Sequence, residues 1–204
     1  MRTSLRIALC LLVLTLFDAV VPDSSFAAVL NFDELSSGTV VNERYEYMGV
    51  HISAVGTGLS DIIATTPPGA CGATAASAPN VLSYRAEGEC PDVHDETGWF
   101  AVDFDTPQNQ VSITAVHQGP NSAAYLKAYG ADGFIEIAWS VPGPSMTQVP
   151  QTLIVAPPLD RQRITRVLFG VYHSSDPVIF DDLSLDLIVP ARSTSWGTLK
   201  ARWN

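Results

Sequence analysis

Short runs of alternating apolar and polar residues follow one another along most of the second half of this chain. Each run is rich in β-branched and aromatic residues and is bounded by Gly, Pro, Asn or Asp, which is the pattern of half-buried β-strands. The clearest runs are TGWFAVDF, QVSITAVHQ, AAYLKAYG, GFIEIAWS, QTLIVAP, RITRVLFGVY and VIFDDLSLDL. Seven or more strands at this spacing predict an all-β fold, a sandwich of two antiparallel sheets.

Turn residues predict two of the connections. GADG at residues 130–133 predicts a tight hairpin turn in which Asp132 and Gly133 supply positive φ angles. The stretch from Gly56 to Pro79 is dominated by Gly, Ala, Ser, Thr and Pro. It offers few large apolar side chains to bury, so we expect an extended surface loop there.

The first 27 residues have the features of a secretory signal peptide. Arg2 and Arg6 precede an apolar run over residues 7–17, and Ser25 and Ala27 stand where a signal peptidase reads small residues, which predicts cleavage after Ala27. The run is shorter than the roughly 20 residues that span a bilayer, and no later run is long and apolar enough. The sequence thus predicts a secreted, extracellular or cell-surface protein without a transmembrane segment.

Charge and cysteine content narrow the candidate partners. The net charge is −10, and the leader removes as many bases as acids, so the mature chain keeps a field that repels phosphate backbones. We therefore expect no nucleic-acid partner. Cys71 and Cys90 are the pair left after the leader, and in an exported chain they predict a disulfide, with two buried free thiols as the alternative. Only His94 is near them, too few ligands for a zinc site.

One phrase, an aromatic residue followed by two acids and a leucine, occurs near both ends of the expected fold as FDEL and FDDL. Phe180 and Leu183 are three residues apart, so a regular strand would point them to opposite faces, and the same holds for Phe32 and Leu35. A β-bulge, or a strand that changes its pairing partner at the acids, would let both apolar residues face the core. The acids would then point to a common side.

If the first and last strands are neighbours, these acids approach and repel one another. Calcium takes six to eight oxygen ligands and would remove the repulsion. The predicted cofactor is therefore calcium, with Asp33, Glu34, Asp181 and Asp182 as candidate ligands. The alternative is that the acids only mark strand edges, where outward charges discourage edge-to-edge pairing. A second acidic cluster, at residues 87–98, is interpreted as a solvated loop.

A sugar site requires an aromatic surface on which a pyranose ring can stack, flanked by planar polar groups. If Leu126 and Ala128 face the core, then Tyr125, Lys127 and Tyr129 line the other face of their strand. Trp99 begins a strand beside the acidic loop, whereas Trp139, which alternates with Ile135 and Ile137, is predicted to be core. The candidate ligand-binding residues are Trp99, Tyr125 and Tyr129, and the alternative is that these rings only fill a sheet surface.

Catalytic motifs are absent from the sequence. It contains no G-x-S-x-G, H-E-x-x-H, Walker loop or dinucleotide fingerprint, and its four histidines fall at no metal-ligand spacing. Paired carboxylates could serve a glycoside hydrolase, because the separation of two carboxylates is a spatial property that a sequence does not reveal. We predict no catalytic residues.

Four segments together resemble a known class of domain: NFDELSSGTVVNERYEYMGVHIS, FAVDFDTPQNQVSITA, LKAYGADG and RVLFGVYHSSDPVIFDDLSL. They are similar to the jelly-roll β-sandwich domains of galactose-binding-like and carbohydrate-binding modules in secreted bacterial proteins, over about residues 29–188. The resemblance implies a jelly roll, often with a structural calcium between the first and last strands, which would fall on Asp33 or Glu34 and on Asp181 or Asp182. Many such modules bind sugars.

The chain is thus divided into a signal peptide at 1–27, a jelly-roll domain at 28–189 and a basic tail at 190–204. The tail, ARSTSWGTLKARWN, resembles short S-x-W-G-x-L-K endings of secreted bacterial proteins, which implies a sorting signal, with a loosely docked terminus as the alternative. The predicted function is a non-catalytic module that binds a glycan or cell-surface polysaccharide. A structural or adhesive surface protein without glycan affinity is the second hypothesis, and a glycoside hydrolase the third.

Overall fold

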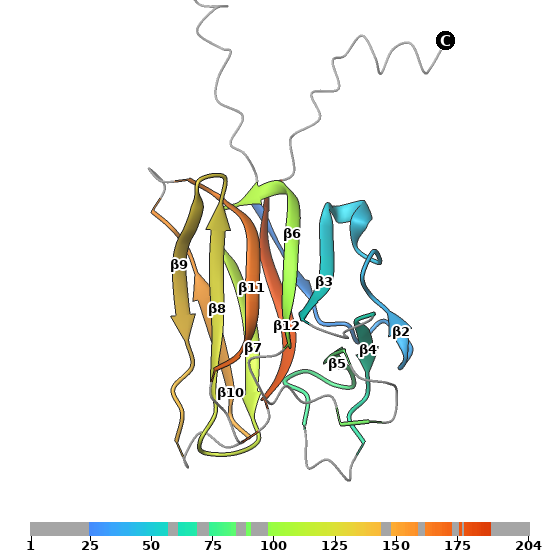
Figure 1. The fold of residues 1–204 in the computed structure, drawn as a ribbon. Coiled ribbons are helices and arrows are strands. Elements are labelled where there is room, and N and C mark those ends of the chain that lie inside the picture. The colour runs from blue at the N-terminus through green and yellow to red at the C-terminus, as the bar shows by residue number, and fades with distance from the viewer. Residues whose placement is uncertain are drawn as a thin grey trace, which may run out of the picture. The chain divides into compact units, whose positions relative to one another are not determined.

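Two antiparallel sheets pack face to face, as Figure 1 shows in a computed structural model. One sheet has the strand order β10-β7-β12-β5-β4-β2, with β1 also paired to β12, and the other has the order β3-β6-β11-β8-β9. The predicted jelly-roll β-sandwich is therefore confirmed. The residues that the structure describes are 25–56, 61–68, 74–84, 89–90, 98–143, 148–158, 162–172, 176 and 178–188.

The strands of the first sheet are β1 (Ser25–Leu30), β2 (Thr39–Val40), β4 (Ile63–Thr65), β5 (Val81–Ser83), β7 (Val111–His117), β10 (Pro150–Val155) and β12 (Val178–Ile188). Those of the second sheet are β3 (Val50–Gly56), β6 (Gly98–Gln108), β8 (Ala123–Gly130), β9 (Gly133–Trp139) and β11 (Ile164–Tyr172). A short 3-10 helix, η1 (Glu46–Met48), precedes β3. These strands belong to the compact unit Phe26–Leu187; of the second unit, Met1–Ser25 with Ile188–Asn204, only Ser25 and Ile188 are described.

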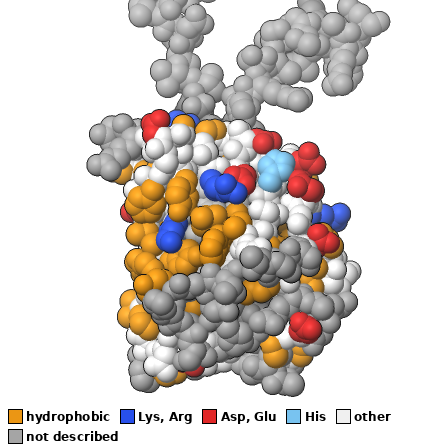
Figure 2. Space-filling model, in the orientation of Figure 1, with side chains coloured by type: hydrophobic (Ala, Val, Ile, Leu, Met, Phe, Trp, Pro, Cys, Tyr) orange, Lys and Arg blue, Asp and Glu red, His pale blue; other side chains and the backbone are white. Residues whose placement is uncertain are grey.

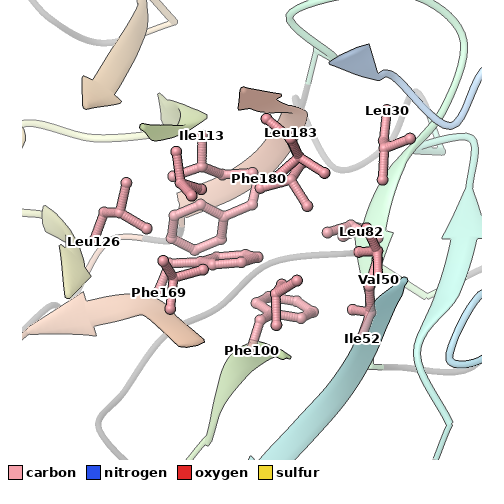
Figure 3. Packing of buried hydrophobic residues seen from close by; sticks show 14 of the residues in the cluster. Leu30, Val50, Ile52, Leu82, Phe100, Ile113, Leu126, Phe169, Phe180 and Leu183 are labelled. Atoms are coloured by element: carbon pink, nitrogen blue, oxygen red, sulfur yellow. The ribbon is translucent and has the colours of Figure 1, made fainter. Parts of the chain in front are cut away.

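Three phenylalanine rings join the two sheets at the centre of the core (Figure 3). Phe100 on β6 and Phe169 on β11 stack with ring centroids 5.0 Å apart. Phe180, from β12 of the opposite sheet, contacts Phe169 at 5.1 Å and Phe100 at 5.9 Å. All three side chains are fully buried, so the alternating pattern of these strands directs one side of each sheet into a shared apolar interior.

The predicted hairpin turn connects β8 to β9, since Gly130 pairs with Gly133 across it. Only Gly133 has a positive φ, 112°; Asp132 does not, which corrects one detail of the prediction. The Asp132 amide instead donates to Gln162 Oε1 at 2.8 Å. The turn is therefore held partly by a side chain from the segment that precedes β11.

The stretch after β3 is not wholly a surface loop. Ile62, Ile63 and Ala64 are buried, and Ile63–Thr65 forms β4 between β5 and β2. The prediction was wrong there because two adjacent isoleucines are enough to anchor a short strand inside a sheet, even within a segment poor in large apolar residues. Among the described residues, no helix is long and apolar enough to cross a membrane.

Candidate functional site

The outer face of the five-stranded sheet carries the predicted aromatic residues. On β8, Ala124, Leu126 and Ala128 are fully buried in the core, so Tyr125, Lys127 and Tyr129 lie on the opposite face. This confirms the face predicted for that strand. Figure 2 looks onto this side of the molecule, where hydrophobic side chains gather over β8, β9 and β11, with Lys or Arg side chains among them.

A row of rings runs across the strands of this face. Tyr125 pairs with Gly170 on β11 and with Trp139 on β9. A Cβ added at Gly170 would lie 3.0 Å from the Trp99 Cβ and 3.1 Å from the Tyr125 hydroxyl oxygen, so the ring of Tyr125 extends over β11 towards Trp99. Because Gly170 has no side chain, the Tyr125 ring has room to lie across β11 at this position.

Trp139 belongs to this outer face and not to the core, which corrects the prediction. Its side chain is 46% exposed and makes edge-on contacts with Tyr125 at 5.8 Å and with Tyr172, itself 48% exposed, at 5.7 Å. The cause is a register shift where β9 pairs with Ala128 and Tyr129 of β8. This irregularity breaks the alternation along β9, so Ile135 packs against the core whereas Trp139 does not.

The three residues predicted to bind ligand differ in accessibility. Trp99 and Tyr129 are half-buried, but Tyr125 is only 6% exposed. The Lys127 ammonium nitrogen lies 4.5 Å from the centroid of the Tyr125 ring, in a cation–π contact that covers part of it. Tyr125 thus lies beneath the surface of the face, and the more exposed rings are Phe134, Trp139 and Tyr172, none of which was predicted to bind ligand.

A hollow of about 500 Å³ adjoins this row at the β8–β9 hairpin end of the face. An ion pair stands in it, with Arg166 Nε 3.2 Å from Asp103 Oδ1 and both side chains 46% exposed. Arg166 and Asp103 are directly paired residues of β11 and β6, so the sheet itself sets their approach. The hollow is lined by Asp103, Tyr129, Gly130, Ala131, Gly133, Thr165, Arg166 and Leu168.

A second charged group borders the face on β3. His51 Nδ1 lies 2.9 Å from Glu43 Oε2, and His51 Nε2 lies 3.2 Å from Asp105 Oδ1. The hydrogen bond to Glu43, with a smaller contribution from Asp105, raises the pKa of His51 above its ordinary value. These carboxylates are well exposed, so the group is a solvated border of the face and gives it a negative edge.

The repeated phrase behaves as predicted in β12 and differently near β1. In β12, the register against β7 shifts between Asp181 and Ser184, Asp182 has a φ of 49°, and both Phe180 and Leu183 are fully buried. The predicted bulge is therefore confirmed, and β1 does pair with β12.

The first copy of the phrase follows β1 as a turn and not as a bulged strand, which corrects the prediction. The Leu35 amide donates to the Phe32 carbonyl at 3.1 Å, and Phe32 has a φ of 63°. The turn reaches the same result, because Phe32 and Leu35 are both buried.

Acids of both copies accept hydrogen bonds from the segment between β4 and β5. Ser77 donates its amide to Asp181 Oδ2 at 2.9 Å and its hydroxyl to Asp182 Oδ1 at 2.9 Å. The amide of Asn80 donates to Asp33 Oδ1 at 2.9 Å. Backbone and hydroxyl donors from residues 77–80 thus compensate part of the repulsion that the sequence analysis identified.

Burial strongly changes the pKa of Asp181. Its side chain is fully buried, and burial, followed by the neighbouring charges of Asp182 and Asp33, raises its pKa to about 7. Hydrogen bonds from the amides of Ser77 and Asp182 act in the opposite direction. Desolvation wins because two amide donors do not replace the hydration of a buried carboxylate.

The predicted calcium ligands are only partly brought together. Glu34 accepts a hydrogen bond from the Tyr45 hydroxyl at 2.7 Å, and both oxygens of Asp181 already accept amide hydrogen bonds. Within the described ranges, no group of three or more His, Cys, Asp or Glu side chains has the arrangement of a metal site. Among the described residues, Oε2 of Glu34, Oδ2 of Asp33 and Oδ2 of Asp182 accept no hydrogen bond and are left for an ion, and calcium stays a prediction.

Several other predictions fall on residues outside the described part of the chain. They include Cys71, so the disulfide with Cys90 stays a prediction, and most of the acidic cluster at 87–98. The signal peptide lies there up to residue 24, and so does the whole basic tail at 190–204. Ser25, Phe26 and Ala27 are described, as the first half of β1.

Comparison with known proteins supports the fold. No protein-family model matches the chain, and no curated protein does. Among solved structures, the K2 cleaved adhesin domain of Lys-gingipain superposes with a TM-score of 0.51 at 14% identity, over 79% of this chain and 100% of that one. The C-terminal family 22 carbohydrate binding module of Clostridium thermocellum Xyn10B gives a TM-score of 0.45 at 11% identity, over 82% and 95% of the two chains. A mutant form of the family 29 carbohydrate binding module CBM29-2 gives 0.37 at 12%, over 79% and 91%. At 14% identity, the superposition on the adhesin domain shows that the two chains share a β-sandwich fold. It does not show that they share an activity.

Proposed function

We propose that this protein is an exported, non-catalytic module that binds carbohydrate through the outer face of its five-stranded sheet. The observation that carries the proposal is the cross-strand row of rings from Trp99 through Tyr125 to Trp139 and Tyr172. Two of these large rings are about half exposed to solvent, although burying them would be favourable. A surface that exposes adjoining aromatic rings is suited to a partner that covers them.

The polar groups beside the rings favour a sugar as that partner. A pyranose has apolar C–H faces that pack on aromatic rings and hydroxyl groups that need both donors and acceptors. Lys127, Arg166 and Asp103 supply such groups within the same sheet face. A partner with only apolar surface would leave these charges without hydration or hydrogen bonds, at a cost in binding free energy.

The absence of catalysis is also part of the proposal. A glycoside hydrolase requires two carboxyl groups that flank the bond to be cleaved. In the cluster formed by the repeated phrase, Asp181 is fully buried and cannot reach a substrate. Asp103 and Arg166, the groups in the hollow, form an ion pair of one acid with one base, which suits binding and not hydrolysis.

Substituting the exposed rings tests this proposal. We expect Trp139→Ala and Tyr172→Ala each to weaken retention on the bound glycan about tenfold, because each removes a ring that would stack on the sugar. Trp99→Ala and Tyr129→Ala, at positions selected from sequence, should weaken it as well. The measurement is a glycan array followed by affinity electrophoresis. The control is Tyr47→Ala, which removes an 82% exposed ring of η1, outside this face.

The outcome that contradicts the proposal is the absence of retention on any glycan of the array. A structural or adhesive surface component then becomes the better hypothesis, because its aromatic face would meet protein instead of sugar. That alternative predicts the protein on intact cells without glycan affinity. The fold itself does not separate the two hypotheses, since β-sandwich domains serve many functions.

Calcium is a second, separate proposal, in which Asp33 and Asp182 contribute ligands between the turn after β1 and the bulge of β12. Binding to the native state alone stabilises by about 2.7 kcal/mol at a hundredfold excess over Kd. We therefore expect a chelator to lower the melting temperature by roughly 5 to 10 °C relative to excess calcium. Asp33→Asn and Asp182→Asn should shrink this shift, whereas Asp61→Asn, at an exposed position before β4, should not. Identical midpoints with chelator and with calcium would refute the ion.

A further inference from the structure

We propose that the hollow at the β8–β9 hairpin end of the five-stranded sheet binds one sugar residue of an uncharged glycan. One hydroxyl group of this sugar bonds to Asp103 and the adjacent hydroxyl group bonds to Arg166. The inference rests on the proposed function and narrows it to neutral sugars. The hollow of about 500 Å³ combines a carboxylate, a guanidinium and a tyrosine ring, with Leu168 as an apolar part of its lining.

Arg166 and Asp103 have hydrogen-bonding groups that their ion pair does not use. Arg166 approaches Asp103 through Nε and one carboxylate oxygen, at 3.2 Å. A guanidinium has five donors and a carboxylate about four acceptor sites. Among the described residues, the terminal nitrogens of Arg166 and the second oxygen of Asp103 have no protein partner. Both side chains are nearly half exposed, so these atoms are open to a ligand.

The matching chemistry on the ligand is a pair of neighbouring hydroxyl groups. Each hydroxyl can donate one hydrogen bond and accept others. One hydroxyl can therefore accept from Arg166 while the next donates to Asp103, and both bonds are charge-assisted. Because β6 and β11 pair directly at these two residues, the donor and the acceptor are positioned before the ligand arrives.

The tyrosine supplies the surface for the sugar ring. Tyr129 pairs with Arg166 across β8 and β11, so its side chain and the guanidinium belong to the same face. Its ring is fixed by an edge-on contact with Phe134, with centroids 5.9 Å apart and planes at 74°. A sugar that rests on this ring would present its hydroxyl edge to the ion pair.

Charge selects a neutral ligand. A uronic acid, sulfate or phosphate would place its negative charge beside the Asp103 carboxylate, on a protein whose net charge is −10. The positive charge of Arg166 is already partly neutralised by Asp103. Lys127, on the neighbouring part of the face, is directed onto the Tyr125 ring. Arg166, the cation that lines the hollow, is thus already paired with an acid, and the described residues that line the hollow offer an acidic sugar no other positive charge.

The test measures how two substitutions change the affinity of the exported protein for mannohexaose, xylohexaose, cellohexaose and polygalacturonate. We expect Arg166→Gln and Asp103→Asn each to weaken binding of a neutral hexasaccharide about tenfold or more, since each removes a charge-assisted hydrogen bond. The control, Glu43→Gln, removes a more exposed acid that contacts His51 outside the hollow and should leave the affinity unchanged. Melting temperatures should stay close to wild type, because an exposed ion pair contributes little stability.

The sign of the Asp103→Asn effect separates the two classes of ligand. For a neutral sugar the substitution weakens binding, whereas for an acidic sugar it removes a repulsion and strengthens binding. Stronger binding of polygalacturonate than of every neutral hexasaccharide would overturn the inference. Unchanged affinity in both variants would overturn it while leaving the proposed function in place. If none of these carbohydrates and no glycan of the array binds, both are wrong.

Discussion

Raising the pH from 4 to 8 is expected to destabilise this protein through one buried side chain, Asp181. Its pKa is raised from 3.8 to about 7 in the folded chain. Between these two values the native state keeps the proton and the unfolded state loses it, so the free energy of unfolding falls as the pH rises. The contribution is complete below pH 4 and lost above pH 7. Its magnitude is on the order of 4 kcal/mol.

Asp181→Asn isolates this contribution from that of the other titrating groups. The amide is neutral at every pH, so the stability difference between wild type and variant should decrease by several kcal/mol from pH 4.5 to pH 7.5. For a domain of this size, that corresponds to a change in the melting-temperature difference on the order of 10 °C. Chemical denaturation at both pH values, with chelator present throughout, is the measurement. A stability difference that is the same at both pH values would show that Asp181 does not titrate in this range.

Replacing Asn80 with alanine is expected to be the most damaging substitution of a polar residue in the cluster. Asn80 is 1% exposed, and its side-chain amide donates to the carbonyls of Phe32 at 3.1 Å and Leu35 at 2.7 Å. Its own carbonyl oxygen accepts from the Thr66 hydroxyl at 2.8 Å. Asn80→Ala removes these three hydrogen bonds, each of which contributes about 1 kcal/mol. It also leaves the Leu35 carbonyl without a donor, at about 1 to 3 kcal/mol, whereas the Phe32 carbonyl still accepts from the Leu35 amide.

We therefore expect Asn80→Ala to lose on the order of 3 kcal/mol or more of unfolding free energy, measured by denaturant titration. The matched control is Asn109→Ala, since Asn109 is less buried and donates one long hydrogen bond, 3.3 Å, to Asp186. That variant should lose less than about 1 kcal/mol. Equal losses in the two variants would mean that Asn80 does not hold the turn after β1.

Both predictions concern the same piece of architecture. The turn after β1 and the bulge of β12 present acids and carbonyls to one side, and Ser77 and Asn80 supply the donors. The two copies of the phrase therefore share a common partner in the segment between β4 and β5. This arrangement explains why a chain would carry similar phrases at both ends of its fold without requiring them to touch one another directly.

The sequence by itself was sufficient for features encoded within one strand. Alternation along β8 predicted which side Tyr125, Lys127 and Tyr129 occupy, and the three-residue spacing of Phe180 and Leu183 predicted the bulge of β12. These predictions succeed because side-chain direction repeats every two residues, so a break in phase is visible in the sequence. The all-β class follows from the same local pattern, repeated over many strands.

The tertiary structure alone decided what depends on register and on partners distant in sequence. Trp139 faces outward because the register of β9 against β8 shifts, and the sequence of β9 contains no residue from which that shift could be predicted. Ser77 meets Asp181 across a separation of 104 residues, and Asp103 meets Arg166 only because β6 and β11 pair. Local propensity cannot specify such meetings, since they arise when the whole sandwich closes around its core and the register of every strand is chosen together.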